Sequence, residues 1–364
     1  MLPSPFLIFP PKWAKVNFPA PKPPSRLRGQ DLAQIRFSRT LAAVKQQKHV
    51  LVTGGAGFIG SHLVERLLAD GKQVVVIDDC STGRKENLAT ALKNPKLTFL
   101  EGKVSERPEL KQVAADAESI YHLAAAVGVE LVMKSALQAI ETNLRETQVM
   151  LDAASAHKTP ILITSTSEVY GKSVKPAFSE EDDLLIGPPH FTRWSYACSK
   201  LMDEFLALAH ERESGAPVII ARLFNTVGPR QTGRYGMALP RFIAAARSGE
   251  ALKVFGDGRQ TRCFCYVKDT VEALVRLQNC PAARGQIFNV GSEEEVSIRR
   301  LAELVKAALA SSSSIEIVPY GDAYPQGFQD MLRRRPNVEK LSKFIGFRPS
   351  TALADIIRLT AALQ

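Results

Sequence analysis

A glycine-rich turn between a strand pattern and a helix pattern constrains the fold of this chain more than any other feature. An apolar run at 49–53 leads into glycines spaced Gly-x-x-Gly-x-x-Gly, and a helical pattern follows at 61–70. Glycine lets the backbone turn tightly and approach a pyrophosphate, while the helix amino terminus supplies free N–H groups. The turn therefore predicts a dinucleotide-binding unit. The residues expected beside the dinucleotide are Gly54, Gly57, Phe58, Ile59 and Gly60.

Strand patterns alternate with helix patterns from residue 49 to about residue 222. The expected strands are 49–53, 73–78, 97–101, 119–123, 160–164 and 217–222, and the expected helices include 61–70, 135–156 and 196–212. This alternation predicts an α/β fold with a Rossmann-type doubly wound parallel sheet. Ligands of such sheets bind at the carboxyl ends of the strands.

Beyond residue 223 the alternation loosens, which favours a smaller C-terminal substrate-binding lobe. A strand near 287–290 and a helix at 297–310 are expected to return to the main sheet, so that the lobe interleaves with the first domain. The predicted dinucleotide-binding domain is 49–225, with a returning segment at about 267–310. The predicted lobe is 226–266 and 311–355.

The first 48 residues differ in composition from the rest. They carry nine Lys or Arg against one acidic residue, Asp31, and the first 24 hold eight prolines. This composition predicts a basic, Pro-rich, disordered extension that activity does not need. An organelle-type presequence, a tether to an anionic surface and translated sequence upstream of the true start remain alternatives.

Charge, hydropathy and cysteine content exclude several classes of protein. The extension accounts for +8 of the formal charge of +10, and the remaining +2 gives no reason to expect nucleic acid as a partner. No apolar run approaches the roughly 18–20 residues that span a bilayer, so no membrane insertion is expected. Five irregularly spaced cysteines indicate reduced thiols and a cytoplasmic protein. Cys263-x-Cys265 is not a zinc spacing, and no metal site is predicted.

An acidic residue ends the second expected strand. Asp78 lies eighteen residues past Gly60, where its carboxylate can accept hydrogen bonds from an adenosine ribose. That contact favours NAD over its 2′-phosphorylated form, although Arg84 and Lys85 follow shortly and keep NADP possible.

Two further patterns carry candidate chemistry. Tyr196 and Lys200 are four residues apart on an expected helix, and an ammonium beside a phenol favours the phenolate, so Tyr196 is a candidate base. A half-buried Tyr beside a solvated Lys would give the same spacing. The strand at 160–164 runs into Thr166, Ser167 and Glu168, which would face the cofactor or would merely cap the next turn.

Six ordered motifs make residues 49 to 355 resemble the extended short-chain dehydrogenase/reductase family, and within it the nucleotide-sugar epimerases, dehydratases and decarboxylases. The motifs are the glycine loop, His122–Ala125, Ser165–Gly171, Tyr196-x-x-x-Lys200, Arg222–Arg230 and Gln260–Arg262.

The resemblance implies a tightly held NAD and a nucleotide-sugar substrate. It implies that Tyr196 is the base, that Lys200 binds the nicotinamide ribose, and that Thr166 polarises the substrate hydroxyl. It places Leu123 and Ala124 beside the cofactor, Asn225 and Arg262 at the diphosphate, and Glu130 at the sugar. Family members usually dimerise through the helices that here are 135–156 and 196–212, which implies a homodimer.

The choice among these activities depends on three residues. Ser167-Glu168, and Arg334 two residues before a proline, are similar to the decarboxylases of UDP-glucuronate. This likeness implies C4 oxidation, loss of C6 as carbon dioxide with help from Ser167, Glu168 and Arg334, and return of the hydride to give UDP-xylose.

Other features keep alternatives open. The run 231–237 is closer to epimerases, and Lys103 stands where relatives often have an Asp. A UDP-sugar 4-epimerase acting on UDP-glucose or UDP-glucuronate is the first alternative, and a nucleotide-sugar 4,6-dehydratase is the second. A catalytically silent NAD-binding scaffold is a reading of a different class, which Tyr196, Lys200 and Glu168 disfavour.

Overall fold

A parallel sheet forms the centre of the structure, a computed structural model that describes residues 48–127, 135–232, 237–323 and 329–362. Its seven strands lie in the order β11-β6-β5-β4-β1-β2-β3. They are β1 (His49–Thr53), β2 (Val74–Asp78), β3 (Leu97–Glu101), β4 (Ala117–His122), β5 (Ile161–Thr166), β6 (Val218–Leu223) and β11 (Gln286–Val290). The order reverses beside β1, as in a doubly wound sheet, so the predicted fold class is confirmed.

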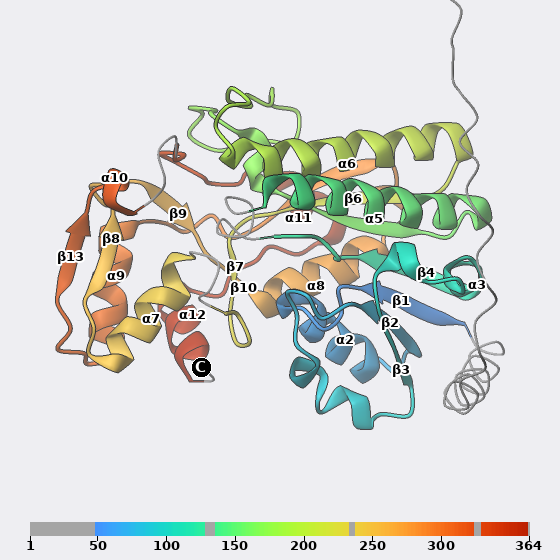
Figure 1. The fold of residues 1–364 in the computed structure, drawn as a ribbon, viewed down its shortest axis with the longest axis horizontal. Helices are drawn as coiled ribbons and strands as arrows, with labels where there is room; N and C mark the ends of the chain where they lie inside the picture. Colours follow the sequence, from blue (N-terminus) through green and yellow to red (C-terminus); the bar gives the residue numbers. More distant parts are fainter. Residues whose placement is uncertain (1–47, 128–134, 233–236, 324–328, 363–364) are drawn as a thin grey trace, which may run out of the picture. The chain divides into compact units, whose positions relative to one another are not determined.

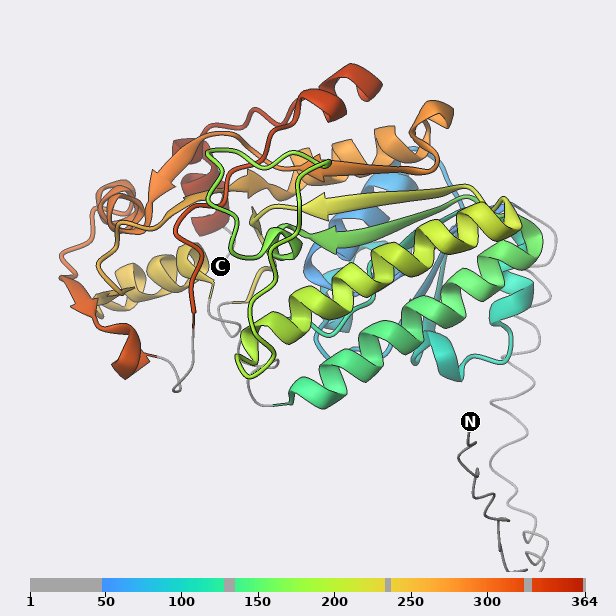
Figure 2. The ribbon, with the colours of Figure 1, turned by 90° about the horizontal axis from the view of Figure 1, so that it is seen from above.

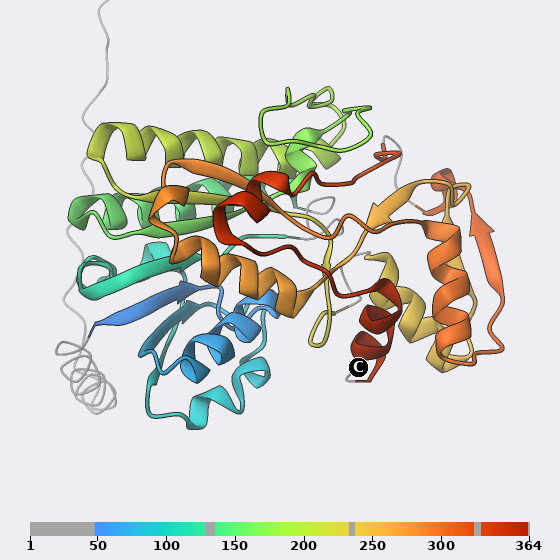
Figure 3. The same ribbon diagram turned by 180° about the vertical axis from the view of Figure 1, so that it is seen from behind.

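Helices cover both faces of the sheet (Figure 1). The long helices α5 (Ala136–His157) and α6 (Arg193–Ser214) lie side by side on one face, as Figure 2 shows from above. The opposite face carries α2 (Phe58–Ala69) and α8 (Val267–Gln278), which are seen from behind in Figure 3. Each long helix ends in a left-handed residue, Lys158 after α5 and Gly215 after α6, a common helix stop. None of the described helices is long and apolar enough to cross a membrane.

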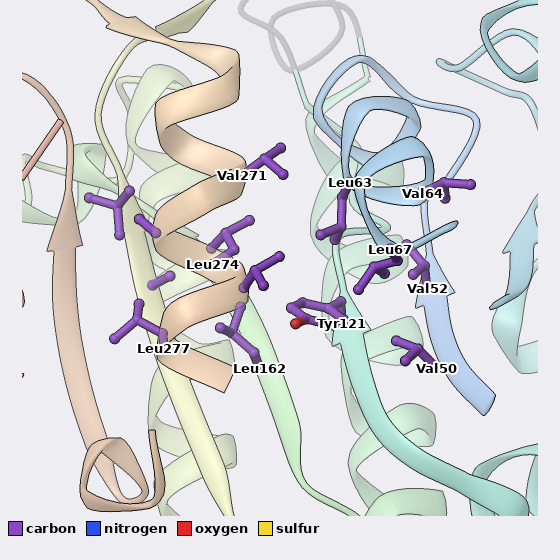
Figure 4. Packing of buried hydrophobic residues seen from close by; sticks show 14 of the residues in the cluster. Val50, Val52, Leu63, Val64, Leu67, Tyr121, Leu162, Val271, Leu274 and Leu277 are labelled. Carbon is purple, nitrogen blue, oxygen red and sulfur yellow. The ribbon is translucent and has the colours of Figure 1, made fainter. Parts of the chain in front are cut away.

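The main core lies between the sheet and the α2–α8 layer (Figure 4). Tyr121 of β4 lies between the side chains of the two helices, with Leu67 on one side and Leu274 on the other. All three are almost completely buried. Burying a leucine side chain contributes about 1.5–3 kcal/mol, so this layer fixes both helices against the strands.

A smaller lobe has its own apolar cluster, centred on Phe242, Leu301 and Ile356. Its helices are α7 (Ala238–Ser248), α9 (Ile298–Ala308), α10 (Tyr320–Ala323) and α12 (Leu353–Ala361). Its strands are β8 (Leu252–Phe255), β9 (Thr261–Cys263), β12 (Glu295–Ser297) and β13 (Ile315–Val318). The short elements elsewhere are η1 (Lys85–Leu88), η2 (Ala91–Lys93), η3 (Val104–Glu106), α3 (Leu110–Asp116), η4 (Ser167–Tyr170), β7 (Thr226–Val227), β10 (Cys265–Tyr266), η6 (Pro281–Ala283) and α11 (Glu339–Ile345).

Two helices pack differently from the prediction. Helix α9, expected at 297–310 to return to the main sheet, instead packs in the lobe cluster through Leu301 and Val305. Strand β12, which directly precedes α9, pairs antiparallel with β9 of the lobe. This pairing directs α9 into the lobe. Conversely, α11 lies inside the range assigned to the lobe, but its Leu341 joins the main core beside β11 and α8. The returning segment of the sheet is therefore α8 and β11, and the chain comes back once more at α11.

A buried ion pair connects α6 to the sheet. Arg222 of β6 donates to both carboxylate oxygens of Glu204 on α6, with Nη2–Oε2 at 2.7 Å and Nε–Oε1 at 3.0 Å. Ser165 Oγ of β5 donates to the same carboxylate at 2.5 Å, and Arg222 Nη1 donates to the Tyr170 hydroxyl at 3.0 Å. Because every partner is buried, the network fixes the position of α6 along β5 and β6.

The glycine turn generates a stability prediction. A Cβ at Gly60 would lie 2.0 Å from the Gly54 carbonyl oxygen, whereas a Cβ at Gly321 in α10 would meet nothing within 4 Å. We expect Gly60→Ala to lower the free energy of unfolding by at least about 1–3 kcal/mol, since backbone must move. Gly321→Ala should leave it unchanged or raise it by up to about 1 kcal/mol. Urea unfolding measures both, and equal effects of the two variants would contradict the close approach at Gly60.

Candidate active site

The predicted site residues that the structure describes line one cavity of about 630 Å³. It opens where the carboxyl ends of β1, β2, β4, β5 and β6 meet, the location expected for a doubly wound sheet. The residues brought together are Gly54, Gly57, Phe58, Ile59, Gly60, Asp78, Leu123, Ala124, Thr166, Ser167, Glu168, Tyr196, Lys200, Asn225, Arg262 and Arg334. Glu130 lies outside the described residues.

The glycine loop forms a cradle that has no room for side chains. Gly54 has φ +72°, and a Cβ there would lie 2.7 Å from the Ala124 amide nitrogen. The Gly57 amide donates to the Gly54 carbonyl at 3.1 Å, and α2 begins at Phe58, so that its first turn, whose N–H groups have no partner within the helix, lines the cavity. Backbone this close and a helix amino terminus together fit a pyrophosphate.

Carboxylates dominate the end of the cavity expected to hold the adenosine ribose. Asp78 accepts hydrogen bonds from the amides of Ala56 at 2.8 Å and Cys80 at 2.7 Å, and Asp79 lines the cavity beside it. Burial raises the pKa of the Asp78 carboxyl, while these amides act in the opposite direction. Lys85 pairs with Glu101 at 3.1 Å, and the cations that line this part of the cavity are Arg84 and Lys103, of which Lys103 pairs with Glu106 at 3.5 Å. Two acidic side chains disfavour a 2′-phosphate, so the residues present fit NAD.

Tyr196 and Lys200 both face the cavity from α6 but differ from the expected pair. The Lys200 ammonium binds Asp203 Oδ2 at 2.8 Å, and Lys200 is only 2% exposed. Burial raises the pKa of Tyr196. The negative charges of Glu168 and Asp203 raise it further, whereas a hydrogen bond with Thr166 lowers it. These effects place the pKa of Tyr196 above its ordinary value in this structure, opposite in direction to the effect expected from Lys200 alone.

Three arginines and two carboxylates form a largely buried cluster beside Tyr196. Arg334 Nη1 lies 3.0 Å from Glu168 Oε1, and Arg193 lies 3.8 Å from the same oxygen. Asp330 Oδ1 lies 3.3 Å from Arg193 Nη1 and 2.7 Å from Arg262 Nη2. Arg334 also donates to Asn225, whose amide nitrogen is held by the Cys263 carbonyl at 3.0 Å. The cluster thus carries one positive charge in excess.

The arginines control the ionisation of Glu168. Burial acts to raise the pKa of its carboxyl, but Arg193 and Arg334 together hold that pKa below its usual value. Burial lowers the pKa of Arg334, Glu168 acts to raise it, and Arg262 and Arg193 lower it further. Both arginines therefore favour the carboxylate form of Glu168.

Sequence analysis missed three residues of this site. Arg193 begins α6 one turn before Tyr196, so the i, i+3 spacing placed it on the same face, and this signal was available. Asp330 lay unassigned in the segment that supplied Arg334, and Asp203 follows Lys200 at i+3. No local pattern shows which cations Asp330 and Asp203 contact, because those contacts depend on how distant segments pack.

Comparisons with known proteins all point to one family of enzymes. The model of the NAD dependent epimerase/dehydratase family matches residues 50–291. A UDP-N-acetyl-alpha-D-glucosaminuronate decarboxylase of Bacillus cytotoxicus is 40% identical over 84% of this chain and 94% of its own length. UDP-glucuronic acid decarboxylase 1 of Danio rerio is 35% identical over 87% of this chain and 72% of its own length.

A solved structure agrees with the same grouping. UDP-glucuronic acid 4-epimerase of Bacillus cereus, in complex with UDP-glucuronic acid and NAD, superposes with a TM-score of 0.77 and 28% identity. The superposition covers 86% of this chain and 98% of that one. Since the family match runs from β1 through β11 and contains the whole dinucleotide cradle, the chain is an enzyme of the NAD dependent epimerase/dehydratase family, with NAD as its cofactor.

Proposed function

We propose that the enzyme oxidises a UDP-hexuronate at C4, decarboxylates the product and returns the hydride, with UDP-glucuronate as substrate and UDP-xylose as product. The observation that carries this proposal is the excess positive charge of the Arg193–Arg262–Arg334 cluster around Glu168 and Asp330. A substrate carboxylate in contact with Arg334 would balance that charge. A neutral sugar would supply no such carboxylate to Arg334, and only the diphosphate, through Arg262, would then offset the charge of the cluster.

The residues of the chain have distinct roles in this reaction. NAD, when bound, supplies the acceptor and later the donor of the hydride. Tyr196, whose ionisation the positive charge of bound NAD would favour, would take the proton of the C4 hydroxyl, while Thr166 holds that hydroxyl and Lys200 contacts the nicotinamide ribose. The 4-keto sugar that forms is a β-keto acid, and it loses carbon dioxide because the ketone accepts the electrons of the breaking bond. Ser167 and Glu168 assist this step and the protonation of C5, and Asn225 and Arg262 bind the diphosphate.

Substrate binding would change the ionisation of Glu168. A substrate carboxylate that pairs with Arg334 removes one of the two arginines that keep Glu168 ionised and places a second negative charge nearby. Both changes raise the pKa of Glu168, because a like charge and a lost counter-ion disfavour a carboxylate. Glu168 could then carry the proton that C5 needs after carbon dioxide leaves.

A second substrate has specific support. The Bacillus cytotoxicus relative that matches this chain over 94% of its own length acts, by its name, on a 2-acetamido hexuronate. The cluster around Arg334 would bind that carboxylate equally well, so UDP-N-acetylglucosaminuronate is the alternative substrate. A product that keeps C6 and is inverted at C4 would indicate a 4-epimerase. A product that has lost water instead of carbon dioxide would indicate a 4,6-dehydratase.

The assembly and location of the enzyme are also proposals. Leu137 of α5 and Phe205 of α6 are 70% and 59% exposed, and Met202 of α6 is 49% exposed. We propose a homodimer in which these helices meet those of a second copy, as family members usually do. All five cysteines are free thiols, which supports a reducing, cytoplasmic location.

Replacing Tyr196 tests the assignment of the base. Tyr196→Phe removes the hydroxyl without changing the ring, so kcat should fall by about 10²–10⁴ while NAD binding is retained. Turnover is measured by product chromatography and NAD binding by fluorescence quenching. Turnover near the wild-type rate would remove Tyr196 from its role.

Replacing Arg334 tests the carboxylate site against a neighbour in sequence. Arg334→Met should reduce turnover of UDP-glucuronate about 100-fold, since losing one partner of a buried charge pair costs about 2–5 kcal/mol. Arg333 is the matched control, because its side chain is 48% exposed and pairs outward with Glu295 at 2.7 Å. Arg333→Met should stay within about twofold of wild type. Equal losses in the two variants would contradict a specific carboxylate contact at Arg334.

A further inference from the structure

A buried aspartate directly behind Lys200 has no role in the reaction as described so far. Asp203 is 0% exposed, and its Oδ2 accepts a hydrogen bond from Lys200 Nζ at 2.8 Å. The two residues are one helical turn apart on α6, so their ion pair lies along the helix. The next residue, Glu204, is engaged by Arg222 and Ser165 instead.

The groups around this pair leave Asp203 as the counter-ion of Lys200. On β4, burial and then Lys200 lower the pKa of His122 to about 3, so the imidazole is neutral, and it is bonded to Thr53 Oγ1 at 2.8 Å and Thr147 Oγ1 at 3.3 Å. Helix α5 contributes the uncharged Thr147 and Asn143.

The remaining charged groups near the pair have other partners. Glu204 is neutralised by Arg222, and Glu168 on η4 by Arg334. Tyr196, on the same helix, is a protonated phenol in this structure. Among the described residues, Asp203 is thus the carboxylate in ion-pair contact with Lys200.

An ammonium that is 2% exposed is costly to keep charged, because burial disfavours the charged form unless a counter-ion is close. Lys200 must also point at one place to donate to a ribose hydroxyl, and its flexible side chain has about 2 kcal/mol of rotamer entropy to lose. Asp203 is an acceptor fixed one helical turn away. It stabilises the charge of Lys200 and restricts its side chain before the cofactor binds.

We propose that Asp203 is a positioning residue that, as the buried counter-ion of Lys200, stabilises its ammonium and holds it directed at the NAD ribose. The proposal rests on the role of Lys200 in the proposed function. It predicts that the cost of losing Asp203 grows with pH, because Lys200 without its counter-ion gives up its proton more readily.

Asp203→Asn is the direct test, since the amide keeps the shape and a hydrogen-bond acceptor but removes the charge. The matched control is Glu303→Gln, because Arg300 and Glu303 form an ion pair of the same i, i+3 spacing on the exposed surface of α9. We expect NAD affinity of wild type and Glu303→Gln to change less than about twofold between pH 7 and pH 9. The NAD affinity of Asp203→Asn should fall about tenfold for each pH unit above the pH at which the variant's Lys200 loses its proton. An Asp203→Asn profile parallel to wild type would overturn the proposal.

Turnover gives a second readout that a merely structural role would not move. The alkaline fall of kcat should begin at lower pH in Asp203→Asn than in wild type, with KM for the UDP-sugar unchanged at pH 7. The binding experiment does not involve the reaction. If Tyr196→Phe retained full turnover, the proposed function would fail while the comparison of NAD binding across pH would still decide the role of Asp203.

A single variant and a double variant keep the proposal testable if Asp203→Asn folds poorly. Lys200→Met leaves a fully buried carboxylate without its cation and should lower Tm. Adding Asp203→Asn to it should raise Tm again, and NAD binding by the double variant should not depend on pH beyond that of Lys200→Met. A double variant with a lower Tm than Lys200→Met would show that Asp203 does not act through Lys200.

Discussion

The position of the catalytic helix depends on the bidentate ion pair between Arg222 of β6 and Glu204 of α6. Both side chains are about 3% exposed, so breaking the pair would leave an uncompensated charge inside the protein, at a cost of about 3–5 kcal/mol. Ser165 and Tyr170 extend the network onto β5 and η4. Because α6 can neither slide nor rotate without breaking these bonds, the residues earlier on it are held against the ends of the strands.

The side chains of helix α6 belong to two parts of the site. Lys200 and Asp203 face inward near β4, while Arg193 at its first turn reaches the cluster formed by Glu168, Asp330, Arg262 and Arg334. The hydride chemistry and the recognition of a carboxylate are thus fixed by the same rigid element. This arrangement explains how one fold can support different outcomes of a shared C4 oxidation, because the cluster beyond Tyr196 determines what happens to the keto sugar.

Local patterns predicted the sheet and the cradle but not the distribution of charges. The run His49–Thr53 and the glycines after it have few structural alternatives, since strand, turn and helix follow within a short stretch. The apolar face of α9 predicted a buried helix, yet nothing local says whether the sheet or the lobe buries it. The spacing of Tyr196 and Lys200 likewise did not reveal that burial, Glu168 and Asp203 raise the pKa of Tyr196 in the folded chain.

The central claim, that the Arg334 cluster receives a carboxylate which the enzyme then removes, is tested most directly by following that carbon. The purified full-length protein with NAD would be incubated with UDP-glucuronate or UDP-N-acetylglucosaminuronate carrying ¹³C at C6, and the products observed by NMR. The account predicts that the label leaves the sugar as carbon dioxide and bicarbonate while a UDP-pentose or its 2-acetamido counterpart accumulates. A label that stays on a six-carbon sugar whose C4 is inverted would contradict it.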